Sequence, residues 1–203
     1  MKGAKMRIYR LLIFLVACFI FLPESFAITL LVKDEALRKL FPEAQIIEEK
    51  ITADSAQISQ IRNLLGGRLV HIKARNNQAA ELIDQQKEFV FYRAIKDGKD
   101  VGAAIILDEP GKWGNVKFII SLSLDASINS MAVMEYKEIR GRPIASSSFM
   151  SQFKRKTIKD KITFGVDIVG ITGATVSSEA SCFTAKKAIV LYSELFMKKT
   201  GNR

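Results

Sequence analysis

Hydroxyl side chains and glycines are concentrated in nine residues, Gly170 to Ser178, with the sequence Gly-Ile-Thr-Gly-Ala-Thr-Val-Ser-Ser. A long helical pattern follows, and the first turn of a helix presents unpaired backbone N–H groups and the positive end of the helix dipole. Small residues let a phosphate approach that backbone closely. The spacing therefore suits a phosphate group, and the Thr175 hydroxyl could carry one as an ester. The alternative is a turn in which a Thr or Ser side chain caps the helix.

The first 27 residues have the pattern of a secretory signal peptide. Four basic residues precede an apolar run from Leu11 to Leu22, and Ser25-Phe26-Ala27 fits a cleavage site. The apolar run is shorter than the roughly 20 residues that a membrane-spanning helix needs. We therefore predict an exported protein, in the periplasm or at the outer face of the cytoplasmic membrane. An uncleaved membrane anchor and a lipoprotein acylated at Cys18 are the alternatives.

The charge of the chain is moderately basic. Without residues 1–27, which hold four basic residues and one acidic residue, the formal net charge falls from +10 to +7. The positive residues are scattered, and no nucleic-acid motif or basic stripe interleaved with aromatic residues is present. Nucleic acid is therefore not an expected partner. A solvated basic face is the simple interpretation, and contact with anionic lipid headgroups is an alternative.

The chain offers few groups for nucleophilic or metal chemistry. It has one histidine, His71, and one cysteine beyond the N-terminal segment, Cys182. Cys182 lies on the apolar stripe of the last helical pattern, so we expect a buried small side chain. His71 stands between Val70 and Ile72, which predicts a strand residue that points away from the apolar face. We expect no disulfide, no conventional metal site and no Cys/His catalysis.

The periodicity of apolar residues predicts the elements that position the Gly170–Ser178 loop. Helices are predicted at residues 34–40, 53–65, 146–153 and 176–198, and strands at residues 69–74, 88–95, 101–107, 116–124, 128–136 and 162–168. Asp97-Gly98 predicts a type I′ turn between two of these strands. Consecutive strands at hairpin spacing, with helices at both ends, predict an α+β fold in which helices flank an antiparallel sheet. The loop would then join the last strand to the last helix.

Two segments make the chain resemble the FMN-binding domain family. This family includes one subunit of the Rnf-type electron transport complex and one of the sodium-translocating NADH:quinone reductase. Residues Thr172 to Ser178 match the family's Ser/Thr-Gly-Ala-Thr-x-Ser/Thr signature. Residues Glu138 to Ile144, followed by Phe149, Gln152 and Phe153, resemble its Glu-x-x-Gly segment and the short helix after it. The order of the parts, from export signal through the hairpin to the loop, is also similar, and the likeness covers residues 85–195.

The resemblance implies that FMN is joined through its phosphate to Thr175 by a flavin transferase, which acts after export and uses FAD as donor. The other residues that it implies in cofactor binding are Thr172, Gly173, Ala174, Ser177, Ser178, Glu138 and Gly141. Each of these residues also has an alternative role without a cofactor. The Thr and Ser residues could cap the helix, Gly141 could be an ordinary turn glycine, and Glu138 could be a solvated carboxylate.

The resemblance also implies how the chain is organised and what it does. Residues 28–84 would form the N-terminal helical or mixed part, and residues 85–203 the FMN-binding domain. The flavin would supply the redox chemistry, because the sequence shows no paired carboxylates or catalytic triad. The expected function is electron transfer with a membrane or secreted redox partner, rather than catalysis with acid/base groups of the chain itself.

One position departs from the family signature. Members usually carry an acidic residue three positions before the Ser/Thr, where this chain has Val169, and Asp167 lies two residues earlier. In a strand, a shift of two residues keeps the same face but moves the carboxylate by about 6.6 Å. The alternative is therefore non-covalent FMN binding, or a cofactor-free sensor or assembly module at the membrane surface.

Overall fold

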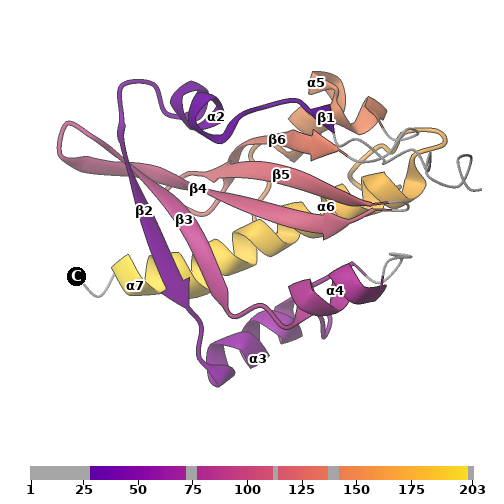
Figure 1. The fold of residues 1–203 in the computed structure, drawn as a ribbon, viewed down its shortest axis with the longest axis horizontal. Coiled ribbons are helices and arrows are strands. Elements are labelled where there is room, and N and C mark those ends of the chain that lie inside the picture. The colour runs from indigo at the N-terminus through magenta and orange to yellow at the C-terminus, as the bar shows by residue number, and fades with distance from the viewer. Residues whose placement is uncertain (1–27, 72–76, 112–113, 137–141, 201–203) are drawn as a thin grey trace, which may run out of the picture.

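A curved antiparallel sheet forms the centre of the molecule (Figure 1). The structure is a computed structural model that describes residues 28–71, 77–111, 114–136 and 142–200. Within these ranges the sheet has six strands in the order β1-β6-β5-β4-β3-β2, and each neighbouring pair is antiparallel. The strands are β1 Ile28–Thr29, β2 Gln45–Thr52, β3 Glu88–Lys96, β4 Lys99–Pro110, β5 Asn115–Leu122 and β6 Ile128–Tyr136.

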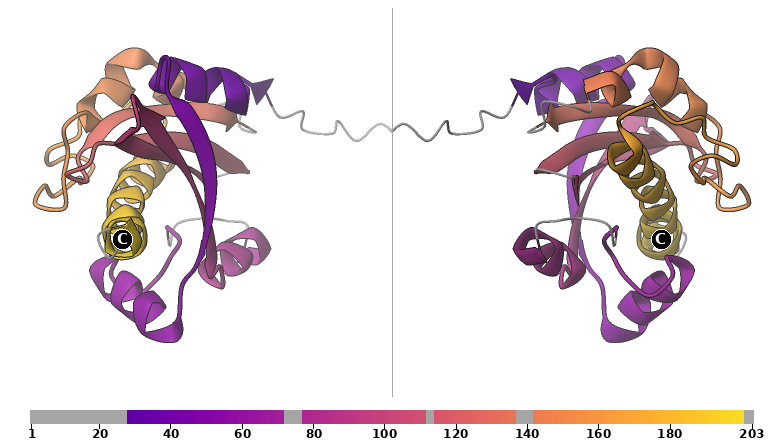
Figure 2. Two further views of the ribbon diagram at one scale, coloured as in Figure 1. Left: turned by 90° about the vertical axis from the view of Figure 1, so that its left-hand side faces the viewer. Right: turned by 90° about the vertical axis from the view of Figure 1, so that its right-hand side faces the viewer.

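Helices flank this sheet, which confirms the predicted α+β fold. The α-helices and the irregular helical turns are α2 Lys33–Leu40, α3 Ser55–Leu64, α4 Asn77–Asp84, η1 Arg142–Ala145, α5 Ser147–Met150, η2 Ser151–Phe153, α6 Thr175–Leu191, η3 Tyr192–Met197 and α7 Lys198–Thr200. Figure 2 shows the sheet curving around α6, with α2 outside the curve. Among the described residues, no helix is both long and apolar enough to cross a membrane.

The alternation of side chains along the strands divides the buried residues into two clusters. On β3, Phe89 and Phe91 pack in the large cluster with α3 and α6, while Tyr92 and Ala94 pack in a smaller cluster with α2. At the C-terminal end of α6, the ring of Phe91 lies 5.2 Å from that of Phe196, measured between centroids. The inner face of the sheet therefore holds α6 in place.

Several local predictions are confirmed. The sequence offers Thr52 or Asp54 as the cap of the helix predicted at residues 53–65, and Asp54 is the one that caps α3, in a capping box with Gln57. Asp97 and Gly98 both have positive φ, as a type I′ turn requires. Cys182 is a buried free cysteine, and its burial raises the pKa of the thiol to about 12.

The strand predicted at residues 69–74 is wrong for the part that the structure describes, which ends at His71. The backbone N–H of Leu69 donates to Asp84 Oδ1 at 2.7 Å, and that of His71 donates to the Glu109 carboxylate. Carboxylates therefore satisfy the N–H groups that a strand neighbour would have bonded. The ring of His71 lies beside Phe183 of α6, with 6.1 Å between the ring centroids.

A buried pair of opposite charges connects α6 to the sheet. Lys187 on α6 and Glu109 on β4 are 1% and 0% exposed, and Lys187 Nζ lies 3.8 Å from Glu109 Oε2. Within the described residues, neither of these two atoms has a hydrogen-bond partner. Burial raises the pKa of Glu109 to about 7 and lowers the pKa of Lys187, while the charge of each group opposes the shift of the other.

Breaking this pair should destabilise the fold. Glu109→Gln or Lys187→Met alone should lower the free energy of unfolding by about 3–5 kcal/mol, because each leaves one buried group uncompensated. The double variant Glu109→Gln/Lys187→Met should recover most of that loss, since it removes both buried charges and keeps an amide oxygen as acceptor for the N–H of His71. Urea denaturation measures all three variants. Losses that simply add in the double variant would contradict this account.

The same pair predicts a pH dependence. The folded state keeps the Glu109 proton between pH 4.5 and about 7, whereas the unfolded state loses it near pH 4.5. The wild type should therefore lose stability relative to Glu109→Gln as the pH rises through this range. Parallel stability profiles of the two proteins, measured by urea denaturation, would show that Glu109 does not titrate in this way.

Candidate functional site

The loop that leads into α6 is open where the sequence predicts a phosphate. Ala174 is the N-cap residue of α6, and its methyl side chain makes no capping hydrogen bond to the first turn. Gly173 has a φ of +81°, and a Cβ built there would meet no atom within 4 Å. The alternative of a Thr or Ser side chain that caps α6 is therefore wrong, and the start of the helix is left to another acceptor.

The hydroxyl groups of the loop fall into an exposed and a buried pair. Thr172 and Thr175 are exposed, and Thr175 is the first residue of α6. Ser177 and Ser178 are 3% and 0% exposed. Ser178 Oγ accepts the N–H of Ile171 at 3.4 Å and so connects the loop to the helix. The exposed pair is thus the one that an external molecule can reach. Glu138 and Gly141 lie outside the described residues, so the structure does not place them relative to this loop.

The segment before the loop is a tight turn, so the strand predicted at residues 162–168 is wrong. Asp167 Oδ1 accepts the N–H of Thr163 at 2.7 Å, and Oδ2 accepts the N–H of Ile162 at 3.1 Å and Lys156 Nζ at 2.8 Å. Only an isolated bridge between Phe164 and Ile168 remains of a strand-like pattern. The Asp167 carboxylate accepts the backbone N–H groups that a neighbouring strand would otherwise bond. Because these residues do not form a strand, the displacement of about 6.6 Å expected between the positions of Asp167 and Val169 does not apply.

These bonds also set the charge state of Asp167. Burial raises its pKa, but the hydrogen bonds from Lys156, Thr163 and Ile162 outweigh burial and lower the pKa to about 2. Asp167 is therefore an ionised structural carboxylate that is fully engaged within its own turn. It does not stand in for the acidic residue that the family usually carries at the position of Val169.

Val169 itself is held by its backbone and presents its side chain to solvent. Its side chain is among the exposed large apolar groups, at 76% for the residue. Its N–H donates to Gln152 Oε1 at 2.8 Å, and its carbonyl accepts from Gln152 Nε2 at 3.0 Å. The next residue, Gly170, supports the ring of Phe164, because a Cβ there would lie 1.7 Å from Phe164 Cε2. A substitution at Gly170 would displace that ring.

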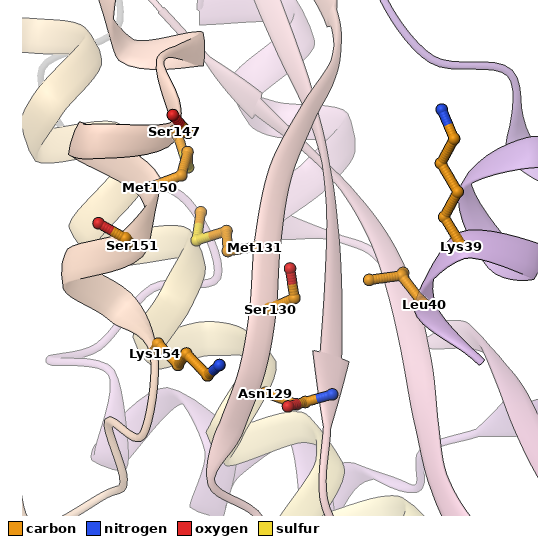
Figure 3. Close-up of a pocket in the computed structure, with 9 residues that line it drawn as sticks. All are labelled: Lys39, Leu40, Asn129, Ser130, Met131, Ser147, Met150, Ser151 and Lys154. Atoms are coloured by element: carbon orange, nitrogen blue, oxygen red, sulfur yellow. The ribbon is translucent and has the colours of Figure 1, made fainter. Parts of the chain in front are cut away.

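A separate hollow lies between α5 and η2, β6 and the end of α2. Its volume is about 380 Å³, and its lining residues are Lys39, Leu40, Asn129, Ser130, Met131, Ser147, Met150, Ser151 and Lys154. Figure 3 shows α5 and η2 on one side of β6 and the end of α2 on the other. None of the predicted site residues that the structure describes lines this hollow, so it is distinct from the loop at Thr175.

Comparison with known proteins supports the resemblance found in the sequence. Residues 111–190 match the family model described as FMN-binding domain, and this match includes the Thr172–Ser178 loop. Residues 111–190 therefore resemble an FMN-binding domain, which supports the predicted family and FMN as its cofactor. The residues that hold FMN, and its covalent attachment to Thr175, stay predictions.

Among solved structures, the chain is similar to one subunit of the Na(+)-translocating NADH-quinone reductase from Parabacteroides distasonis. The TM-score is 0.46 and the sequence identity is 17%, over 73% of this chain and 77% of that chain. No curated protein sequence matches the chain.

The interactions that shape the loop were not visible in the sequence. Gln152 belongs to the segment that resembles the family, but nothing in that segment indicates that its amide bonds Val169. Lys156 stands in a basic cluster that suggests a solvated face, and its partner Asp167 lies 11 residues away. Both interactions join η2 and the residues just after it to residues 167–169, which lie 11 to 17 positions further along the chain.

Replacing Asp167 should test the importance of the turn. Asp167→Asn should lower the free energy of unfolding at pH 7 by about 1–2 kcal/mol, because the ionised carboxylate is stabilised in the folded state. In the wild type this contribution should disappear as the pH falls from 3.8 towards 2, where the folded-state carboxylate becomes protonated.

Urea denaturation at several acid pH values measures this effect. Asp125→Asn is the matched control, because Asp125 also accepts a backbone N–H, from Ser127, but is exposed. An acid profile of Asp167→Asn that coincides with the wild-type profile would contradict the assignment.

Proposed function

We propose that the chain is an exported flavoprotein that carries FMN as a phosphoester on Thr175 and transfers electrons at or outside the cytoplasmic membrane. One observation carries this proposal. Thr175 presents an exposed hydroxyl on the first residue of a helix that has no side-chain cap, within the family's own signature. A helix N-terminus is a favourable place for an anion, because its backbone N–H groups and dipole offset negative charge.

The residues around Thr175 fit a phosphate group. The backbone at Gly173 and Ala174 and the exposed hydroxyl of Thr172 would hold it, and Gly173 leaves the space above the turn free. Bound FMN supplies the redox chemistry. The chain holds the cofactor-bearing helix in a fixed position, because α6 is buried along the sheet and contacts it through Lys187 and Glu109.

Attachment of FMN would be a phosphoryl-group transfer without redox change. Thr175 Oγ1 forms a bond to the phosphorus of the FMN half of FAD, while the pyrophosphate P–O bond of FAD breaks and AMP leaves. The hydroxyl proton passes to a base of the flavin transferase. The exposed position of Thr175 suits such an external enzyme. A tethered cofactor is not lost by dissociation outside the cell, which agrees with the N-terminal export signal.

Electron transfer is proposed, rather than a reaction catalysed by the chain, because the sequence carries no set of acid/base or nucleophilic groups near the loop. Its one histidine is His71 and its one cysteine beyond residue 27 is the buried Cys182. The redox partner would be a membrane or secreted protein, since the predicted location is outside the cytoplasm.

Replacing the acceptor hydroxyl tests the proposal. The chain, with its export signal, is expressed beside a flavin transferase and then denatured. The wild type should show in-gel flavin fluorescence and a mass gain equal to FMN minus water. Thr175→Val should lose both signals, because no oxygen remains to form the ester. Thr163→Val is the matched control, because Thr163 is an exposed Thr of the preceding turn whose hydroxyl contacts the carbonyl of Lys161 and not the proposed phosphate site, so this variant should keep its flavin. A labelled Thr175→Val variant would refute the assignment.

Val169 favours a second candidate function, in which FMN binds without a covalent bond in a sensor or assembly module. The side chain at this position is exposed and apolar where the family usually has an acid. A yellow native protein that releases FMN on denaturation would support this candidate. Val169→Asp should raise covalent loading several-fold if the acid guides the transferase, and unchanged loading would exclude that idea.

A further inference from the structure

We propose that Gln152 is the positioning residue for attachment of FMN, an inference that rests on the function proposed above. Its side-chain amide forms two hydrogen bonds with the backbone of Val169, and these bonds fix the conformation of the loop that presents Thr175 to the transferase. Gln152 itself does not touch the reacting atoms.

The two bonds between Gln152 and Val169 resemble a rung of a β-ladder. The amide oxygen accepts the Val169 N–H at 2.8 Å, and the amide nitrogen donates to the Val169 carbonyl at 3.0 Å. One side chain thus satisfies both backbone groups of a single residue, which requires a donor and an acceptor on the same planar group. Both distances lie within the usual range for N–H···O bonds.

Gln152 is itself held by a well-packed support. It belongs to η2, between the buried residues Phe149 and Phe153, whose ring centroids lie 5.6 Å apart in an edge-on arrangement. Its Nε2 also contacts the carbonyl of Phe149 at 3.4 Å. Ser146 caps the preceding helix through the N–H of Phe149. The amide therefore extends from a fixed helical turn rather than from a mobile segment.

Three side chains hold the loop at alternate residues before it reaches the motif. Lys156 bonds the carboxylate of Asp167, Gln152 bonds the backbone of Val169, and Ser178 bonds the N–H of Ile171. The next residues, Thr172 and Gly173, are exposed. The supports thus end immediately before the part of the loop that the proposal gives to FMN and the transferase.

The Gln152 amide bonds a residue whose own side chain does not pack in the core. Val169 is exposed, so holding its backbone buries no apolar side chain there. What the amide does is to set the direction of the chain three residues before Thr172. Loss of this hold would let the loop populate other conformations, and the transferase would find the competent one less often.

The experiment measures how fast the transferase labels the purified full chain from FAD, by mass spectrometry, as a function of acceptor concentration. Gln152→Met keeps the length of the side chain but removes both hydrogen bonds. It should raise the KM for the acceptor protein by about tenfold, the effect of roughly one to two lost hydrogen bonds, with little change in kcat. Gln152→Glu keeps an acceptor for the Val169 N–H but loses the donor, so its KM should rise less.

Gln57→Met is the matched control. Gln57 also accepts a backbone N–H, that of Asp54 at 2.9 Å, in the capping box of α3. It should lower stability in urea to a similar extent as Gln152→Met, while its KM stays at the wild-type value. A wild-type KM for Gln152→Met, or an equal rise for Gln57→Met, would overturn the positioning role. An unlabelled wild type would instead overturn the proposed function.

Discussion

The burial of α6 along the inner face of the curved sheet is the constraint on which the rest of the structure depends. Most of its side chains are buried, and the aromatic residues Phe91, Tyr192 and Phe196 pack together beyond its C-terminal end. In the C-terminal half of α6, Lys187 faces Glu109 of β4 in the core, with 3.8 Å between Nζ and Oε2. A helix held in this way cannot shift or rotate without disrupting the core, so its N-terminus stays in one place.

This fixed N-terminus gives the candidate site its properties. A helix that begins with Ala174 and has no side-chain cap leaves its first turn to be satisfied by something else. In most helices a Ser, Thr or Asp would serve, and this sequence has hydroxyl groups nearby that are directed elsewhere. Ser178 bonds the loop, whereas Thr175 remains exposed. The preceding turn, held by Asp167 and Gln152, delivers the loop to this position.

The sequence predicted the parts of the fold that local signals control. The hairpin follows from Asp97-Gly98, the start of α3 from Asp54, and the last helix from its apolar stripe. It did not predict β2, whose strand mixes Glu48, Glu49 and Lys50 with apolar residues at the sheet edge. It also did not predict the turn at Asp167, because Ile162, Thr163 and Phe164 favour a strand locally. There a carboxylate, rather than a neighbouring strand, takes up the backbone N–H groups.

For the candidate site, the motif indicated which loop to examine but not how it is built. A buried lysine at position 187 cannot be distinguished by its sequence from a solvated one, since only the neighbouring Glu109 decides its environment. The bonds of Gln152 depend in the same way on a residue 17 positions away. Contacts of this kind are tertiary, and a periodic pattern carries no information about them.

Mapping the flavin to one residue tests the central claim most directly. After loading in the presence of a flavin transferase, tryptic digestion should yield a fluorescent peptide from Ile162 to Lys186, which contains all the hydroxyl residues of the loop. Fragmentation of this peptide should place the FMN phosphate on Thr175. A flavin on Thr172, on either serine or on a peptide from elsewhere in the chain would contradict the account.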